Sequence, residues 1–254
     1  MNRIRVTLGL IVVVAFISAN ARAQWKTPWD YEGARGPDHW STLDPAYAAC
    51  AGKEQSPIDI RDAQKAKLPA LQFEYKPEPL KYLINNGHTI RVNYHDAKDA
   101  GSYVTFDGTR YQLTQFHFHR PSEELIDGKV YDMVAHFMHQ SSDGKTMGIA
   151  VLLKEGKSNP TIQKLWDHMP VTEGSEHEVP GVAIDPSGLL PKQMDYYMYS
   201  GSLTAPPCTE GITWFVLKMP VEVSPKQIEA FSKLYPHDVR PVQPLNGRVV
   251  KESQ

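Results

Sequence analysis

The sequence has 254 residues, of which 22% are charged, and its formal net charge at pH 7 is −2. Such a nearly balanced composition lacks the basic footprint of a nucleic-acid-binding protein, so we expect no nucleic acid among its partners. The length allows one large β domain or two smaller domains, and no linker, repeat or low-complexity block marks a boundary. We therefore expect one domain over residues 24–254.

Residues 1–23 have the pattern of a secretory signal peptide. Residues 1–5 contain two arginines, the apolar run 6–17 follows, and residues 21–23 form a small-x-small cleavage site. The apolar run is about a dozen residues long, shorter than the ~20 residues that a membrane-spanning helix needs. We expect the mature chain to begin near Gln24, to be periplasmic or secreted, and to have no membrane attachment after cleavage. A retained N-terminal anchor is the alternative.

The chain contains two cysteines, Cys50 and Cys208, both in the part that would be exported. In an oxidising compartment an isolated pair predicts a disulfide. Closing a loop of ~160 residues should stabilise the fold by roughly 4–5 kcal/mol through the entropy of the unfolded chain. The alternative is a pair of unconnected buried thiols.

Strands dominate the predicted elements. Residues 24–57 are rich in Trp, Pro, Gly and Asp without a sustained period, which predicts an irregular segment packed on the core. Beyond it, runs of β-branched and aromatic residues are bounded by Gly, Pro, Asp or Ser, as is typical of strands. The predicted strands are residues 88–94, 109–119, 130–139, 147–154 and 211–218.

Two helices are predicted among these strands. Residues 158–169 carry apolar side chains at helical spacing, and residues 224–235 begin with Ser224 as N-cap and Pro225 at the first helical position. Most strands follow one another without an intervening helix, which favours antiparallel pairing. The predicted fold class is therefore β-dominated α+β, a single domain with a large twisted, mostly antiparallel central sheet and a few short surface helices.

Four histidines lie between residues 111 and 140. In a strand, side chains alternate between faces, so His117 and His119 lie on one face with Gln115, while Phe116 and Phe118 lie on the other. Two imidazoles on one face, two residues apart, can share a metal ion. Three neutral histidines with one open position describe a catalytic zinc site, and no free thiol is left for a closed structural site if the cysteines are bridged.

The third ligand would come from the next strand, residues 130–139. Alternation places Val134, His136 and Met138 on one face of that strand and His139 on the other. The spacing alone does not say which face meets His117 and His119. His136 and His139 are both candidates at this point.

The chain resembles the α-class carbonic anhydrases, of the exported bacterial kind, over nearly all of its mature length. Seven segments run in the family's order: "GPDHW" at Gly36, "QSPIDI" at Gln55, "NNGH" at Asn85, "QFHFH" at Gln115, "SE" at Ser122, "SLTAPPCTEGITW" at Ser202 and "RPVQPLNGR" at Arg240. Any one of these motifs would be weak evidence, but seven in order at family-like distances are specific.

The resemblance implies a zinc cofactor and the reversible hydration of CO2 to bicarbonate and a proton, with attack by zinc hydroxide. It implies His117, His119 and His136 as the zinc ligands. Expected partners are CO2, bicarbonate, inhibitory anions and sulfonamides, and the protein would be a monomer or a homodimer. The competing hypotheses are a catalytically silent zinc-binding module on the same fold and an esterase that uses the same zinc hydroxide.

Three further residues acquire catalytic roles by this resemblance. Glu123 accepts the hydrogen bond of the Thr204 hydroxyl, which must then accept one from the zinc-bound hydroxide and so aims it at the substrate. His88 is the proton shuttle, because its ordinary pKa of ~6.5 suits reversible proton transfer near neutral pH. Without the resemblance, these three would be a solvated loop carboxylate, a turn residue and a surface histidine.

The remaining site residues match the family's substrate pocket. The expected pocket residues are Leu203, Met138, Trp214 and Ala205, with Gln115 and Tyr31 as polar and supporting neighbours of the metal. Apolar residues of this kind would otherwise be ordinary core.

The chain departs from the family at four of these positions. Val134 replaces the glutamate that accepts the second ring N–H of the third ligand, whose partner would then be a water or a backbone carbonyl. Losing such a partner commonly costs ~10–100-fold in metal affinity or activity, so we expect weak zinc retention. Glu124 puts a second acid beside Glu123, Ala205 removes a hydroxyl from the anion site, and Met138 narrows the pocket.

Overall fold

The computed structural model describes residues 27–95 and 101–254, so the predicted signal peptide over 1–23 lies outside the described residues. The strands are β1 Asp59–Ile60, β2 Gln64–Lys65, β3 Gln72–Glu74, β4 Glu78–Pro79, β5 Leu83–Asn85, β6 Ile90–Asn93, β7 Tyr103–Phe106, β8 Thr109–His119, β9 Leu125–Ile126, β10 Met133–Ser141, β11 Thr146–Glu155, β12 Ala183–Ile184, β13 Tyr196–Ser202, β14 Glu210–Val223 and β15 Lys251–Glu252. The α-helices are α1 Trp40–Leu43, α2 Pro160–Trp166 and α3 Pro225–Ser232, and short 3-10 helices cover Gly33–Arg35, Pro45–Ala51 and Pro186–Leu189.

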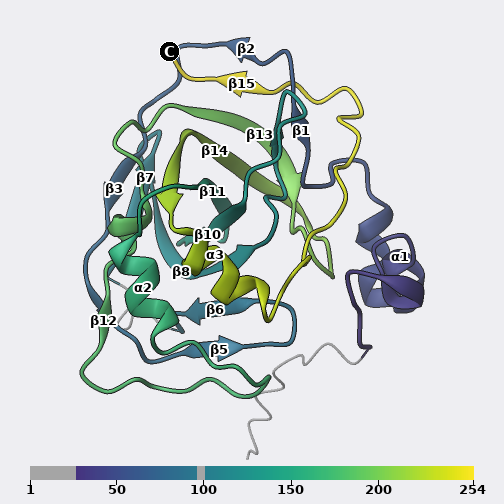
Figure 1. Cartoon of the computed structure of the whole chain (residues 1–254). Helices are drawn as coiled ribbons and strands as arrows, with labels where there is room; N and C mark the ends of the chain where they lie inside the picture. Colours follow the sequence, from purple (N-terminus) through teal and green to yellow (C-terminus); the bar gives the residue numbers. More distant parts are fainter. Residues whose placement is uncertain (1–26, 96–100) are drawn as a thin grey trace, which may run out of the picture.

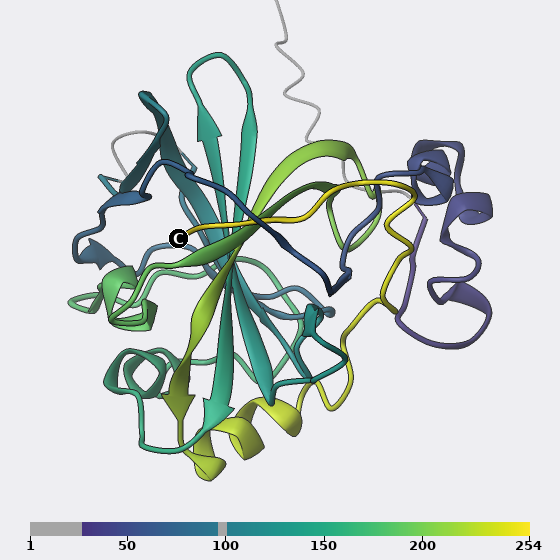
Figure 2. The same ribbon diagram turned by 90° about the horizontal axis from the view of Figure 1, so that it is seen from above.

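Most of these strands form one 11-stranded sheet (Figure 1). Its order is β2-β15-β13-β14-β11-β10-β8-β6-β5, and β7 joins β3 to the edge of β8. All its pairs are antiparallel except β11 with β14 and β15 with β2. The strands fan out when the sheet is seen from above, which shows its strong twist (Figure 2). The predicted β-dominated fold with a mostly antiparallel sheet is confirmed, and two of the strand pairs in this sheet are parallel.

Local sequence signals account for the helix ends. Ser224 caps α3 through a capping box, in which the Gln227 N–H donates to the Ser224 hydroxyl and the Ser224 N–H donates to the Gln227 side chain. The N-cap of α2 is Asn159, whose side-chain oxygen accepts hydrogen bonds from the backbone N–H groups of Thr161 and Ile162. Strand β13 is not among the predicted elements, although its tyrosine-rich sequence is typical of a strand.

The two faces of the sheet carry apolar clusters of different size. On one face Phe116 and Phe118 of β8 enter a large apolar core that α2 and α3 cover, and Trp166 of α2 stacks on Phe231 of α3. The other face carries a smaller apolar cluster that includes Met138 and Trp214. α1 and α2 lie on opposite sides of the molecule in both ribbon views (Figures 1 and 2). The functional histidines of β8 belong to the face with the smaller cluster.

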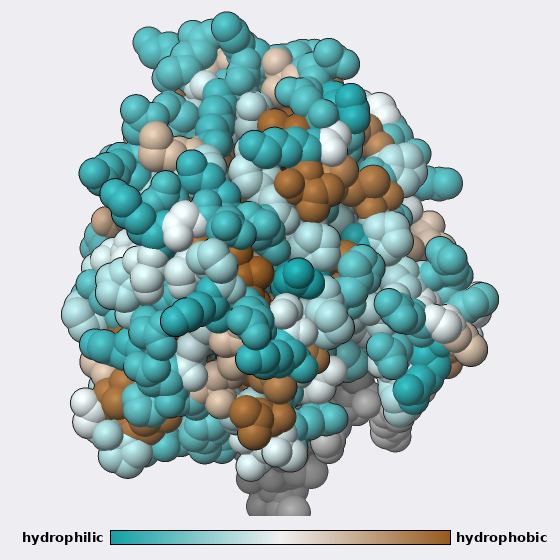
Figure 3. Space-filling model, viewed as in Figure 1, coloured by the Kyte–Doolittle hydropathy of each residue, from teal (hydrophilic) through white to brown (hydrophobic). Residues whose placement is uncertain are grey.

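The surface is largely hydrophilic on the face drawn in Figure 3, with hydrophobic side chains in small separate groups. Among residues 27–95 and 101–254, the exposed large hydrophobic side chains are those of Val130, Val171, Val242 and Val249. Across the described part of the chain, no helix combines the length and apolar character that crossing a membrane requires.

Cys50 and Cys208 form the predicted disulfide, with their Cα atoms 4.9 Å apart and a sequence separation of 158 residues. The bond attaches the 3-10 turn Pro45–Ala51 to the loop that follows β13. Both cysteines are buried beside Trp40 and Tyr47, in a third apolar cluster formed by the N-terminal segment. The disulfide therefore fixes that segment to the loop that contains Thr204.

Replacing both cysteines by serine should destabilise the protein by up to about 5 kcal/mol, because the unfolded chain regains the entropy of a long open loop. Urea unfolding of the Cys50→Ser/Cys208→Ser variant against the oxidised wild type measures this difference. A loss below about 1 kcal/mol would contradict the expectation.

Candidate metal centre and active site

The pairing of β8 with β10 decides which histidine joins His117 and His119. In this antiparallel pair His136 lies opposite His117, and Val134 lies opposite His119. Residues directly opposite each other in a sheet project from the same face. The side chains of His117, His119 and His136 therefore share one face of the sheet.

His139 belongs to the opposite face. A bulge between Met138 and His139 shifts the pairing so that His139 lies opposite Leu113. Its Nε2 atom is 2.7 Å from the Tyr75 hydroxyl, and the two rings are stacked. Burial lowers the pKa of His139 to about 3, so it is a neutral core residue away from the other three histidines.

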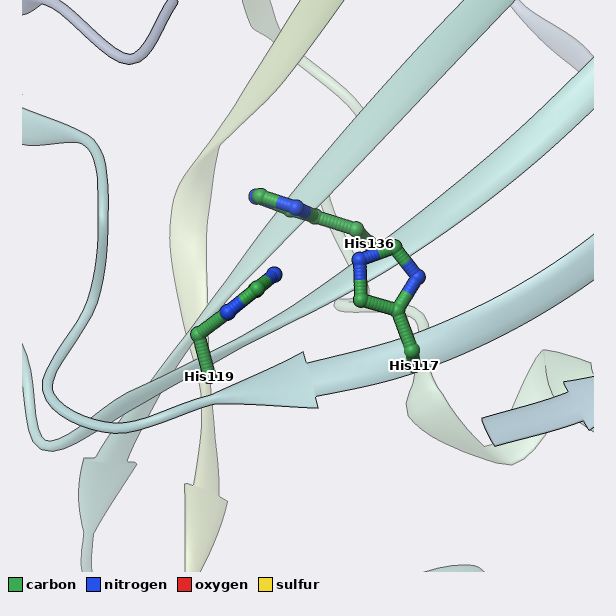
Figure 4. A group of neighbouring side chains, drawn as sticks. All are labelled: His117, His119 and His136. Atoms are coloured by element: carbon green, nitrogen blue, oxygen red, sulfur yellow. The ribbon is translucent and has the colours of Figure 1, made fainter. Parts of the chain in front are cut away.

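The three histidines bring their ring nitrogens together. Figure 4 shows His117 and His119 on one strand and His136 on its neighbour, with the rings turned toward a common point. One nitrogen of each ring lies within 4.8 Å of those of the other two. The Nε2 atom of His119 and the Nδ1 atom of His136 are buried and have no hydrogen-bond partner. Buried polar atoms are rarely left unpaired, so this nitrogen set fits a metal ion such as zinc.

The Nδ1 atoms of His117 and His119 are both held by acceptors. His117 Nδ1 is 2.8 Å from the Gln115 side-chain oxygen, and His119 Nδ1 is 2.7 Å from the Asp238 carbonyl oxygen. When Nδ1 donates its hydrogen, Nε2 keeps its lone pair for a metal. Burial, the largest cause, also lowers the pKa of both histidines well below its ordinary value, which favours the neutral form that binds metals.

His136 also has an acceptor, and it is not the one expected. Its Nε2 atom lies 2.9 and 3.1 Å from the two carboxylate oxygens of Glu124. Burial lowers the pKa of His136, but Glu124 and the more distant Glu123 outweigh burial and raise it. The premise behind the expected weak zinc retention, that Val134 leaves this ring without a carboxylate, is therefore wrong. Glu124 fills that role from the loop between β8 and β10.

Glu123 lies behind the metal-binding nitrogens. It is buried, and its Oε1 atom accepts the Arg240 backbone N–H at 2.9 Å. Its Oε2 atom is 3.5 Å from His119 Nε2 and 3.8 Å from His136 Nδ1. Burial raises the pKa of Glu123 to about 7, against the opposing effects of the His136 ring and, to a smaller extent, of the nearby Thr204 side chain. The structure thus brings the predicted pair of Glu123 and Thr204 together.

A cavity of about 590 Å³ opens over the three histidines. It is lined by all the predicted cavity residues: His88, Thr204, Leu203, Met138, Trp214, Ala205, Gln115 and Tyr31. Of the remaining predicted residues, Glu123 supports the cavity from behind, and the two cysteines hold its Thr204 loop. The Trp214 ring also packs on His136, with their centroids 4.7 Å apart.

His88 lies in this cavity wall, at the turn that leads from β5 into β6. Its ring stacks on Trp29 with the centroids 3.6 Å apart. Burial, the largest influence, lowers the pKa of His88, against the opposing charges of Asp30 and Glu173. The ring is therefore held in a neutral state that can accept a proton.

Besides the role of Glu124, which lies outside the cavity lining, several lining residues were missed from the sequence, among them Trp29 and Arg91. Arg91 lies opposite His117 in the pairing of β6 with β8, so it shares the face of the metal ligands. Strand alternation contained that signal, because it places Arg91 on the face opposite to the apolar Ile90 and Val92. Trp29 lies in an irregular segment, where no periodicity could reveal which way it faces.

The model of the eukaryotic-type carbonic anhydrases matches residues 35–254. The chain belongs to this α-carbonic anhydrase family. A carbonic anhydrase of Nostoc sp. is 42% identical over 243 residues, which cover 93% of this chain and 90% of that protein. One of Neisseria gonorrhoeae is 41% identical, with coverages of 98% and 96%. The α-carbonic anhydrase of Thermovibrio ammonificans, solved with the inhibitor sulfanilamide, has a TM-score of 0.83 and 46% identity, with coverages of 90% and 99%.

These matches agree with the fold and the histidine cluster. The chain is a carbonic anhydrase, and the cofactor of this enzyme family is zinc.

Replacing His136 and His139 by alanine should affect different properties of the protein. His136→Ala removes a nitrogen of the cluster, so zinc affinity should fall by more than about 100-fold, beyond what loss of an outer partner costs. His139→Ala should keep zinc but lose about 1–3 kcal/mol of stability, because Tyr75 loses its buried partner.

Zinc content after dialysis and urea unfolding, measured on both variants, test this pair together. Equal zinc loss in the two variants would contradict the assignment of the ligands.

Proposed function

We propose that this carbonic anhydrase holds zinc with His117, His119 and His136 and acts as an exported enzyme. The observation that carries the proposal is the pair of buried, unpartnered nitrogens, His119 Nε2 and His136 Nδ1, beside a cavity that also contains His117. When bound there, zinc makes water acidic enough to be a nucleophile near neutral pH, a property for which carbonic anhydrases themselves are the reference case. All three ligand histidines are present, which disfavours a silent zinc-binding module.

Glu123 and Thr204 orient the nucleophile in this proposal. In its ionised form, which prevails above the pKa of about 7, the Glu123 carboxylate is an acceptor only, so the Thr204 hydroxyl would donate its hydrogen to it. The Thr204 hydroxyl lines the cavity, and its oxygen lone pairs are then free to accept a hydrogen bond from the nucleophile. The Arg240 backbone N–H donates to the Oε1 atom of Glu123 and so holds this carboxylate in place.

The substrate is placed by an apolar wall. Leu203, Met138 and Trp214 line the cavity beside the histidines, and an apolar wall suits uncharged CO2 better than its charged product. The Trp214 side chain is fixed because its indole N–H donates to the Ser202 carbonyl. Bicarbonate, inhibitory anions and sulfonamides would bind where this wall meets the metal, next to Thr204 and Ala205.

Export is proposed from the arginine-led apolar run at the N-terminus together with the disulfide. A buried disulfide between distant segments persists in oxidising compartments such as the periplasm or the extracellular medium. We place the mature domain at residues 24–254.

CO2 hydration should follow zinc content. Stopped-flow measurement of purified protein should show activity that a chelator abolishes and that about one zinc per chain restores. Activity without stoichiometric metal would overturn the proposal. Ester hydrolysis faster than CO2 hydration at equal enzyme concentration would favour the esterase instead.

Replacing His88 by alanine should lower turnover at low buffer concentration, because the shuttle is lost, and added imidazole should restore part of it. Since burial lowers the pKa of His88, its neutral acceptor form persists below pH 6.5, so the His88-dependent part of turnover should decline only below that pH. His95→Ala, at a partly exposed histidine paired with Glu176, is the matched control. Unchanged turnover of His88→Ala at low buffer would show that another group carries the proton.

A further inference from the structure

We propose that Glu124 is the residue that positions His136 for zinc, in place of the acid that the family carries at position 134. This inference rests on the proposed zinc site of His117, His119 and His136. It assigns a positioning role to Glu124, which in the sequence was only a second acid beside Glu123.

The contact between Glu124 and His136 is exclusive. Both side chains are fully buried, and both carboxylate oxygens lie within 3.1 Å of His136 Nε2. Among the hydrogen bonds of residues 27–95 and 101–254, His136 is the sole donor to this carboxylate. A buried carboxylate is costly unless a donor compensates it, so its presence here depends on the ring N–H of His136.

The backbone of the loop holds Glu124 in place. The Ser122 hydroxyl donates to the Glu124 carbonyl oxygen, and the same hydroxyl accepts the Tyr131 N–H. The next residue, Leu125, begins β9, which pairs with β1, and its N–H donates to the Ile58 carbonyl. The carboxylate is therefore presented to His136 by a fixed segment, which is what positioning requires.

Val134 occupies the strand position from which the family's glutamate would contact this histidine. It lies two residues before His136 on the same face of β10 and is buried in the apolar cluster with Ile58 and Ile60. A glutamate at that position could reach the same ring from along the strand. In this chain the carboxylate comes from the loop instead, and the strand position is apolar.

The His136 ring therefore lies between two consecutive acids. Glu124 contacts Nε2 on the outer side, whereas Glu123 lies 3.8 Å from Nδ1 on the metal side. An acceptor at Nε2 fixes the hydrogen there and leaves the Nδ1 lone pair for zinc, and a charged acceptor also increases the basicity of the ring. Glu124 should therefore slow the release of zinc.

The test is the rate of zinc dissociation into excess chelator, followed without any activity assay. Glu124→Gln keeps an acceptor but removes the charge, and zinc should leave about 10-fold faster. Glu124→Ala removes both, and the increase should approach about 100-fold. Glu78→Gln is the matched control, because Glu78 is also a buried acid but does not line the metal cavity, and its zinc release should equal that of the wild type.

Moving the carboxylate separates positioning from a merely structural role. In the double variant Glu124→Ala/Val134→Glu the strand supplies the acceptor, and zinc release should return to within about 10-fold of the wild type. Val134→Glu alone adds a second buried acid with no second N–H to accept, so it should not slow zinc release. Thermal unfolding of the metal-free variants identifies any that lose zinc because they lose the fold.

Three outcomes would overturn the inference. They are wild-type zinc release from folded Glu124→Ala, equal acceleration in Glu78→Gln, and no recovery in a folded double variant. The proposed function fails separately, if the wild type itself binds no stoichiometric zinc.

Discussion

The register between β8 and β10 is the constraint on which the site depends. Because His117 faces His136 across this pair, two strands suffice to bring three imidazoles onto one face. A slip of one residue would exchange the faces of β10, placing His136 among the phenylalanines of the core and Ala135 or Phe137 opposite His117. The aromatic core under α2 and α3 opposes such a slip, since Phe137 pairs with Phe116 on that face. The packing that stabilises the sheet thus also specifies the metal centre.

Much of this arrangement follows from local patterns. Alternation along one strand predicts that His117 and His119 share a face, and Ser224 predicts the start of α3, because both depend on neighbours in sequence. Alternation could not choose between His136 and His139, since that choice depends on the pairing of two strands across a loop. The family resemblance made the choice, and the register supports it independently.

The contact between Glu124 and His136 could not be predicted from the positions of these residues in the sequence. Val134 correctly indicated that the usual carboxylate is missing from the strand, but hydrogen-bond partners are set by distance in space. The loop after β8 folds back over β10, so an acid 12 residues before His136 in sequence reaches its ring. Trp29 was missed for a related reason, because it lies in a segment without a repeating pattern and its stacking on His88 depends on tertiary packing alone.

The parts of the site also differ in the length of chain that separates them. The three ligands, Glu123 and Glu124 all lie in the hairpin of β8 and β10 and its connecting loop. Closing so short a loop has a small entropic cost, so the contacts among these residues are local ones. Thr204 comes from a distant loop that is attached through Cys208 to a segment 158 residues away. The metal centre thus depends mainly on local contacts, whereas the geometry that would direct substrate also requires the N-terminal segment and the Thr204 loop to meet.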